Sequence, residues 1–211
     1  MDAFEKIARM EGFQNIAGID EAGRGPLAGP VVAGAVIFPS GYTNNLIKDS
    51  KKISAGKRQE AYEAIKHDAL AVGLGVIEAA IIDKVNILQA TFLAMREAVY
   101  DLSLRPDYLL IDGLHRLAVE MPQKTLVKGD AQSVSIAAAS IIAKVTRDRI
   151  MEIYHRQYPQ YNFLQNKGYG TAEHRHAMQI YGVCKIHRKS FHLKKNNNQA
   201  ELNLRHSEKE Q

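Results

Sequence analysis

Five short apolar segments, separated by longer stretches, set the strongest limit on how this chain can fold. Short runs that are rich in β-branched and other apolar residues predict β-strands. We expect strands over residues 15–20, 30–38, 71–77, 108–112 and 125–129. Only a loop rich in Gly and Pro separates the first two strands, so this pair is predicted to be antiparallel.

The longer stretches between and after the strands predict helices. We expect these over residues 1–14, 54–67, 79–102 in one piece or two, 133–158 and 172–181. Ser54 is a candidate N-cap, and Pro159 is expected to end the long helix before it. Because helices would join the later strands, those strands are predicted to pair in parallel. The chain is therefore predicted to be an α/β domain whose mixed sheet begins with a three-stranded antiparallel meander.

Composition narrows the class of protein. With 211 residues, 45% of them hydrophobic, the chain can bury one core, or one core plus a small appendage. Cys184 is the only cysteine, which excludes an intrachain disulfide and a cysteine-based zinc site. The N-terminus lacks an apolar signal core, and no run approaches the roughly 20 apolar residues of a membrane-spanning helix. We expect a cytoplasmic protein with no membrane partner.

The charge balance points weakly to a polyanionic partner. The formal charge is +5 and the pI is about 9.2, a balance that favours nucleic acid but is shared by many ordinary soluble proteins. After residue 193 the sequence is polar with few apolar anchors. We therefore predict a folded domain over residues 1–193, with a C-terminal helical part, and a flexible polar tail over residues 194–211.

Acidic residues fall where strands end. Asp20, Asp112 and Asp130 each close or follow a predicted strand, and Glu21 follows Asp20 directly. If neighbouring strands bring these ends together, the carboxylates repel one another and favour a cation. An all-oxygen set suits Mg²⁺ or Mn²⁺, and two such ions can promote in-line displacement at a phosphodiester. The alternative is that each acid serves a turn or a helix cap, with Asp130 as the N-cap of a helix that starts near residue 132.

The loop between the first two strands, Gly23-Arg24-Gly25-Pro26-Leu27-Ala28, matches the loose dinucleotide-binding fingerprint G-x-G-x-x-A. That fingerprint needs a helix directly after the loop, and here prolines, a further glycine and a strand follow. Two interpretations are left open. The loop is a plain tight turn, or its glycines let a ligand approach the backbone while Arg24 lies beside a phosphate.

Six sequence blocks, in order, resemble type 2 ribonuclease H, the bacterial ribonuclease HII family. They are IDEAGRGPLAGPVV from Ile19, DSKKIS from Asp49, LLIDG from Leu109, the long block from Val127 to Met151, YPQY with NKGYGT from Tyr158 to Thr171, and IHRKSF from Ile186. Arg24 and the roughly 15 residues before the first strand fit type 2 better than the sister type 3 enzymes. Lys185, where relatives often carry proline, is a departure that leaves the path into IHRKSF open.

The resemblance implies a ribonuclease H-like mixed sheet flanked by helices, and a metal-dependent endonuclease. Its catalytic, metal-binding acids would be Asp20, Glu21, Asp112 and Asp130, with Mg²⁺ or Mn²⁺ as cofactor. Gly23, Arg24 and Gly25 would read the 2′-hydroxyl of the ribonucleotide at the cut, Tyr169 would stack on the following sugar, and Lys51 would contact a phosphate.

The substrates implied are RNA–DNA hybrids and duplex DNA that carries single ribonucleotides. Incision 5′ to the ribonucleotide, by two metal ions, would leave 5′-phosphate and 3′-hydroxyl ends. We expect a monomer, and whether a replication clamp is a partner is left open. The rival functions are a non-catalytic nucleic-acid-binding module on the same fold and a nucleotide-dependent oxidoreductase.

Several other residues are expected to have ordinary structural roles. The eight histidines should lie mostly at the surface, with His187 contacting backbone, phosphate or a structural partner. Lys144 and Arg147 should form surface ion pairs, and Ser140 should simply let helices pack closely. Tyr158, Tyr161 and Tyr181 should be core or rim aromatics.

Overall fold

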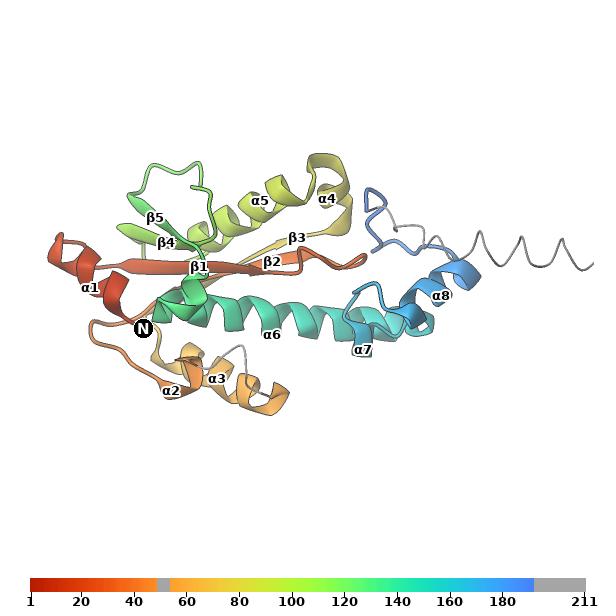
Figure 1. Ribbon diagram of the computed structural model, residues 1–211, viewed down its shortest axis with the longest axis horizontal. Helices are drawn as coiled ribbons and strands as arrows, with labels where there is room; N and C mark the ends of the chain where they lie inside the picture. Colours follow the sequence, from red (N-terminus) through yellow and green to blue (C-terminus); the bar gives the residue numbers. More distant parts are fainter. Residues whose placement is uncertain (49–53, 192–211) are drawn as a thin grey trace, which may run out of the picture.

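A five-stranded mixed sheet lies at the centre of the computed structural model, which describes residues 1–48 and 54–191. The strand order is β3-β2-β1-β4-β5 (Figure 1). The bounds are β1 (Ile16–Ala22), β2 (Val31–Ile37), β3 (Ala71–Ile77), β4 (Tyr108–Asp112) and β5 (Gln123–Leu126). The predicted ribonuclease H-like class, a mixed sheet flanked by helices, is confirmed.

Strand pairing follows the predicted pattern with two differences. β1, β2 and β3 form the antiparallel meander, and β4 pairs in parallel with both β1 and β5. The prediction that helices join all later strands is wrong for β4 and β5, between which residues 113–122 form a loop. β5 also lies earlier than predicted, because the backbone leaves the strand after Leu126 and Lys128 adopts a left-handed φ of 55°.

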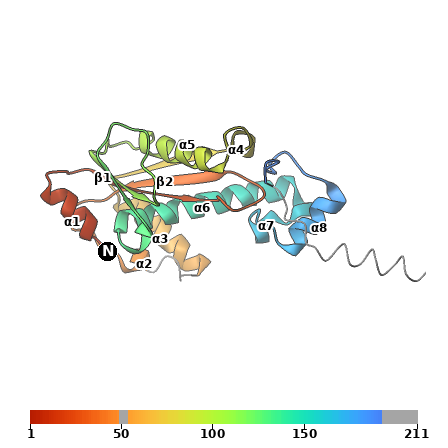
Figure 2. The same cartoon turned by 45° about the horizontal axis from the view of Figure 1, so that its top comes forward.

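Helices cover both faces of the sheet (Figure 2). α6 packs on one face against β1 and β2, and α5 packs on the other face against β2 and β3. The predicted helices are confirmed, and the segment 79–102 forms two of them because Asn86 has a φ of 69° and caps the second. Their bounds are α1 (Ala3–Met10), α2 (Asn45–Lys48), α3 (Ala55–Asp68), α4 (Ala79–Val85), α5 (Ile87–Tyr100), α6 (Val134–Gln157), α7 (Phe163–Asn166) and α8 (Ala172–Tyr181), with short 3₁₀ helices η1 (Gly129–Ala131) and η2 (Pro159–Tyr161).

Close packing fixes α6 against the strand that carries the first acids. A Cβ on Gly18 would overlap the backbone of Ser135 and Ile136, and one on Gly34 would lie 2.6 Å from the Ala139 carbonyl oxygen. Glycine in the strands opposite an alanine-rich helix therefore lets two backbones meet. The position of β1 relative to α6 is set within the core, two residues before Asp20.

The far half of α6 extends beyond the sheet and carries the C-terminal helical part (Figure 1). A small separate core joins these elements to the loop after β1, with Ala28, Met151, Tyr161, Phe163, Ala177 and Ile186 at its centre. Tyr161 is a core aromatic and Tyr181 lies exposed at the rim, as predicted. In the described part of the chain, no helix is long and apolar enough to cross a membrane. The boundary at residue 193 stays a prediction, since the tail lies outside the described residues.

Candidate active site

Two of the predicted acids lie side by side because of strand register. β1 and β4 run parallel with Ile19 opposite Ile111, so Asp20 and Asp112 follow at the same level. Side chains at paired positions of neighbouring strands project to the same face of a sheet. Asp20 is only 6% exposed. Glu21, the next residue of β1, is half-buried.

Asp130 is brought toward Asp112 by a backbone hydrogen bond. The amide of Gly129 donates to Oδ1 of Asp112 at 2.6 Å, and Asp130 follows within η1, 6% exposed. The alternative that Asp130 is the N-cap of the following helix is wrong. α6 begins at Val134, and the Ser133 hydroxyl caps it by accepting from the Ile136 amide at 3.2 Å.

The acids perturb one another electrostatically. Burial raises the pKa of Asp20 well above its usual value, and the neighbouring charges of Glu21 and Asp112 raise it further. Burial also raises the pKa of Glu21, and Asp112 adds to this, while the Arg24 guanidinium opposes it through a hydrogen bond of 3.1 Å. A site that resists carrying its own negative charge favours a bound cation.

The donor chemistry fits a hard divalent cation. All four acids offer oxygen, the ligand that Mg²⁺ and Mn²⁺ prefer. Among the described residues, no three His, Cys, Asp or Glu side chains converge closely enough to form a ready-made metal cage. Mg²⁺ commonly keeps several waters and takes further oxygen ligands from a substrate phosphate.

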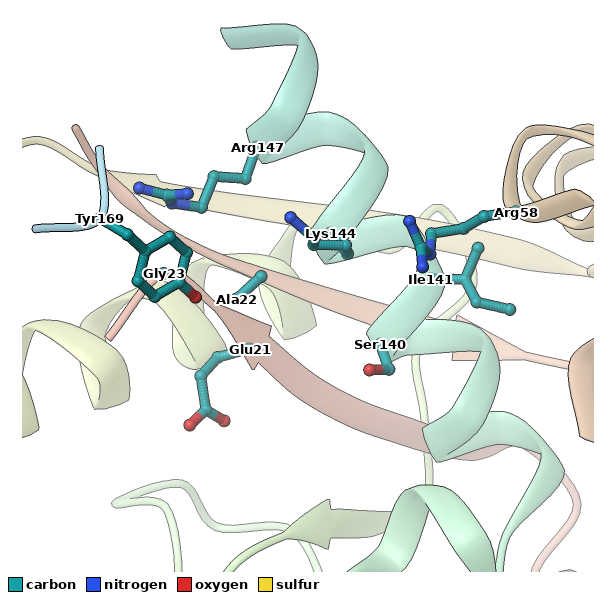
Figure 3. A pocket seen from close by; sticks show the side chains of 9 residues that line it. All are labelled: Glu21, Ala22, Gly23, Arg58, Ser140, Ile141, Lys144, Arg147 and Tyr169. Atoms are coloured by element: carbon teal, nitrogen blue, oxygen red, sulfur yellow. The ribbon is translucent and has the colours of Figure 1, made fainter. Parts of the chain in front are cut away.

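Ser140 belongs to this cluster, a role that sequence reasoning missed. Its hydroxyl hydrogen-bonds the Asp20 carboxylate and lowers the pKa of that group against the other influences. It projects from α6 toward β1 (Figure 3). No sequence signal marked it, and in the structure Ser140 lies about one helical turn beyond Ser135 and Ile136, the residues of α6 that Gly18 contacts.

The glycine loop after β1 has no helix behind it. β2 begins at Val31, so the dinucleotide-binding alternative is wrong. Gly23 has a φ of 99°, and a Cβ there would overlap the Arg147 side chain. Gly25 is exposed, and a Cβ there would meet only Cε1 of Tyr169, at 3.6 Å. The loop thus turns tightly at Gly23 and presents open backbone at Gly25.

Tyr169 lies over this loop from the C-terminal helical part. Its side chain is half exposed, with 48% of the residue accessible, and the Arg147 guanidinium lies 6.0 Å from the ring centre. Ring and loop border a cavity of about 300 Å³ (Figure 3). Its lining combines Glu21 and Ser140 with three cationic side chains, those of Arg58, Lys144 and Arg147. Acids that could hold a cation therefore border a basic cavity that could hold phosphate.

Some of the other expectations for individual residues are confirmed and others are wrong. Lys144 forms the predicted ion pair, with Asp148 at 2.6 Å. The prediction for Arg147 is wrong, since it is 1% exposed and donates to the carbonyls of Ala28, Pro30 and Lys167. His174 and His187 are also buried rather than at the surface. Lys51 lies outside the described residues.

A mixed sheet with carboxylates at the adjoining ends of β1 and β4 defines the class of ribonuclease H-like nucleases. Solved structures agree in fold. The ribonuclease H2 from Pyrococcus horikoshii OT3 matches with a TM-score of 0.71 and 26% identity, over 90% of this chain and 99% of that one. The structure of Bst-RNase HIII in complex with Mn²⁺ matches with a TM-score of 0.69 and 19% identity, over 93% of this chain and 72% of that one.

Sequence comparisons give the family. The family model for ribonuclease HII matches residues 17–194. The ribonuclease HII of Syntrophus aciditrophicus is 69% identical over 92% of each chain, and that of Bacillus subtilis is 54% identical over 90% of this chain and 74% of its own. The chain belongs to the ribonuclease HII family. It is a ribonuclease H, a metal-dependent hydrolase that acts on RNA–DNA substrates, and the oxidoreductase and non-catalytic alternatives are set aside.

Proposed function

We propose that this enzyme cuts the RNA strand of RNA–DNA hybrids and also incises duplex DNA 5′ to a single embedded ribonucleotide. The products would carry 5′-phosphate and 3′-hydroxyl ends. The observation that carries the proposal is the position of the Tyr169 ring against Gly25, at the border of a cavity that Glu21 and Ser140 also line. An aromatic ring, an open backbone and a carboxylate together form a site for a sugar and its phosphate.

We assign Asp20, Glu21, Asp112 and Asp130 as the ligands of two divalent ions, Mg²⁺ or Mn²⁺. When bound, such ions activate water and stabilise the departing 3′ oxygen. The chain's own contribution is to hold the carboxylates in place: the Glu21 amide donates to Asp20 at 2.7 Å, and the Gly129 amide donates to Asp112 at 2.6 Å. A pure binding module gains nothing from acids that repel a polyanion, which argues for chemistry at this edge.

Recognition of the junction is assigned to Gly23, Arg24, Gly25 and Tyr169. The 2′-hydroxyl distinguishes RNA from DNA at a given site. Glycine backbone can hydrogen-bond that hydroxyl at close range, because no Cβ intervenes. The Tyr169 ring then packs on the next sugar, where a deoxyribose fits more closely than a ribose. This arrangement favours a ribonucleotide followed by DNA.

The test compares cleavage of three duplexes: all DNA, DNA with one ribonucleotide, and DNA paired with a full RNA strand. A site built to bind a hydroxyl rejects a substrate that lacks it by about 10⁴-fold. The all-DNA duplex should therefore resist cleavage. Tyr169→Ala should slow the single-ribonucleotide substrate more than the hybrid. Tyr100→Ala removes an exposed tyrosine of α5 as a matched control and should leave both rates unchanged.

Gly25→Ala gives a cleaner probe of the loop than Gly23→Ala. The added methyl at Gly25 meets Tyr169 only at 3.6 Å, an ordinary contact, so the protein should fold normally while both substrates are cut more slowly. Equal cleavage of the all-DNA duplex, or an equal effect of Tyr169→Ala on the other two substrates, would refute the proposed recognition.

Assembly and location stay predictions. We propose that the protein is a cytoplasmic monomer. Light scattering of the purified protein would give its mass in solution and so test the monomeric state. One solved relative, matched with a TM-score of 0.72 and 24% identity over 88% of this chain and 99% of that one, is the ribonuclease HII of Archaeoglobus fulgidus in a complex with PCNA. A replication clamp is therefore the partner to test first, by co-elution with this protein.

A further inference from the structure

Two consecutive residues of the C-terminal segment each connect to one half of the proposed substrate-reading site. His187 and Arg188 are 2% and 3% exposed. The segment is anchored to the glycine loop by its backbone: the Arg188 amide donates to the Leu27 carbonyl at 2.8 Å, and the Gly29 amide donates to the Ile186 carbonyl at 2.9 Å. These two bonds fix the path of the chain after Lys185, which the sequence left open.

Arg188 holds the glycine loop from behind. Its guanidinium donates to the carbonyls of Gly23 at 2.6 Å, Arg24 at 3.0 Å and Gly29 at 3.0 Å. The guanidinium is a rigid planar fork, so three such bonds fix the direction of the peptide groups that accept them. With the Gly23 and Arg24 carbonyls bonded to the guanidinium, Gly25 lies exposed beside Tyr169.

His187 connects instead to Tyr169, through His174. The Cys184 amide donates to Nδ1 of His187 at 2.9 Å, the two Nε2 atoms lie 3.0 Å apart, and Nδ1 of His174 lies 2.9 Å from the Tyr169 carbonyl oxygen. Both rings are buried. The Tyr169 carbonyl also accepts from the Thr171 amide at 2.8 Å, so its two lone pairs are both used.

The two ends of this chain fix the position of every proton along it. A backbone amide can only donate, so Nδ1 of His187 carries no proton, and a carbonyl can only accept, so Nδ1 of His174 carries one. In neutral rings, Nε2 of His187 is then protonated and Nε2 of His174 is not, which is the one arrangement that makes the central hydrogen bond. A proton added to either ring would bring two donors face to face.

We propose that His187 and Arg188 are positioning residues that hold Tyr169 and the Gly23–Gly25 loop in a fixed relation to each other. His187 acts on Tyr169 through His174, while Arg188 acts on the loop directly. The inference rests on the proposed function, in which ring and loop read the same ribonucleotide junction. It predicts that damage to the histidine pair lowers discrimination, whereas damage to Arg188 lowers cleavage of every RNA-containing substrate.

The first test reads the histidine tautomers in the unaltered protein. Long-range ¹⁵N–¹H spectra at neutral pH, with signals assigned by single histidine variants, should show His174 protonated only on Nδ1 and His187 only on Nε2. Any other tautomer, or a doubly protonated ring, overturns the inference. The spectra need no substrate, so they test the hydrogen-bond chain from Cys184 to Tyr169 even if the junction-reading proposal fails, and they need no variant with normal activity.

The second test uses two variants of His174 that separate its nitrogens. His174→Asn keeps a donor near the Nδ1 position and so retains the bond to Tyr169, whereas His174→Gln keeps a polar group near Nε2 and loses that bond. Both leave a similar gap in the core, so comparable melting temperatures are expected. Loss of one positioning hydrogen bond is worth up to roughly tenfold, so kcat/KM on the single-ribonucleotide duplex should fall by about that factor for Gln. It should fall by less for Asn, which keeps the bond to Tyr169 but loses the contact with His187.

The RNA–DNA hybrid provides the internal comparison. His174→Gln should lower kcat/KM on the hybrid by less than about a third of the factor by which it lowers kcat/KM on the single-ribonucleotide duplex. The reason is that the hydrogen bond to Tyr169 is expected to matter mainly for the single-ribonucleotide substrate. Arg188→Lys, which keeps the charge but not the three-carbonyl fork, should slow both substrates alike. Equal losses in His174→Asn and His174→Gln, or a substrate-selective loss in Arg188→Lys, would overturn the inference. If Tyr169→Ala leaves substrate preference unchanged, junction reading fails while the tautomers still report on the histidine pair.

Discussion

Asp20→Asn should make the metal-free enzyme more stable while it abolishes cleavage. Asp20 is buried beside Glu21 and Asp112, and all three influences raise its pKa, so its charge is costly in the folded protein without a cation. Asparagine has nearly the same shape. It can still accept from the Glu21 amide, now 2.7 Å from the carboxylate, and its own amide can donate to the Ser140 hydroxyl. The substitution therefore removes the repulsion and keeps the hydrogen bonds.

The magnitude follows from opposing contributions. Neighbouring like charges repel by roughly 3 kcal/mol at an effective dielectric constant of about 20. A hydrogen bond to a charged group contributes about 1.5–3 kcal/mol, and part of this is lost when the acceptor becomes neutral. The substitution relieves the repulsion from two neighbouring charges and the cost of burying the Asp20 charge, and it weakens two hydrogen bonds. We expect the net gain in unfolding free energy to be about 2 kcal/mol. For a chain of this size, that raises the melting temperature by roughly 4–8 °C.

The assay is thermal unfolding in EDTA and in excess Mn²⁺, with turnover measured in parallel. Metal at about 100 times its dissociation constant should stabilise the unaltered enzyme by roughly 2.7 kcal/mol, so the order of stability should reverse when metal is added. Turnover of the variant should fall by about 10³-fold or more, because an ion ligand is lost, while substrate affinity changes little.

Asp107→Asn is the matched control. Its two oxygens accept from the Gln14 and Asn15 amides at 2.9 Å each, so the same substitution there should lower stability and leave the metal-induced shift intact. A lower melting temperature for Asp20→Asn in EDTA, or an undiminished Mn²⁺ shift, would refute the reasoning that Asp20 is a destabilised metal ligand.

Three further predictions concern single side chains. Ser140→Ala should weaken Mn²⁺ binding measured by calorimetry, by about tenfold for one lost charge-assisted bond, whereas Thr146→Val on the same helix, whose hydroxyl has no hydrogen-bond partner among the described residues, should not. Lys51→Ala should flatten the dependence of binding on salt, the loss of slope being about 0.9 for each phosphate neutralised on a B-form duplex, and an unchanged slope would count against that contact. Burial, with the neighbouring His174, lowers the pKa of His187 from 6.5 to about 4, so the unfolding free energy should decline as the pH falls from 6.5 toward 4, by up to roughly 3 kcal/mol. Urea titrations at each pH should show a shallower decline for His187→Gln.

Local sequence patterns predicted most of the fold. Apolar runs located β1 to β4, and Ser54 caps α3 by accepting from the Lys57 amide at 3.4 Å, as expected. The fifth strand was misplaced because its residues, QKTL, are mostly polar, and the apolar signal lay in Leu126 and Val127 at its end. A short edge strand buries little of its length, so its composition says little about where it begins.

The acids were predictable and the groups that position them were not. Asp20 and Asp112 stand out because a charge closes an apolar strand. Ser140 gives no such signal, since a serine in an alanine-rich helix is equally consistent with close packing. Arg147 was expected to form a surface ion pair, yet its guanidinium bonds the Ala28 and Pro30 carbonyls of the glycine loop.

Burial of Arg147 and Arg188 shows where the specificity of such a site is encoded. Their six guanidinium hydrogen bonds in the described structure all end on backbone carbonyls, none on a carboxylate. Two buried cations whose described hydrogen bonds reach no acid are expensive, and burial lowers the pKa of Arg188 to about 9 although Asp83 opposes this. Paired acids would cancel that charge next to a site meant for phosphate. Carbonyl partners satisfy the hydrogen bonds of the guanidinium groups and leave their positive potential in place. Arginines inside the fold can therefore hold the glycine loop without cancelling the positive charge that attracts phosphate.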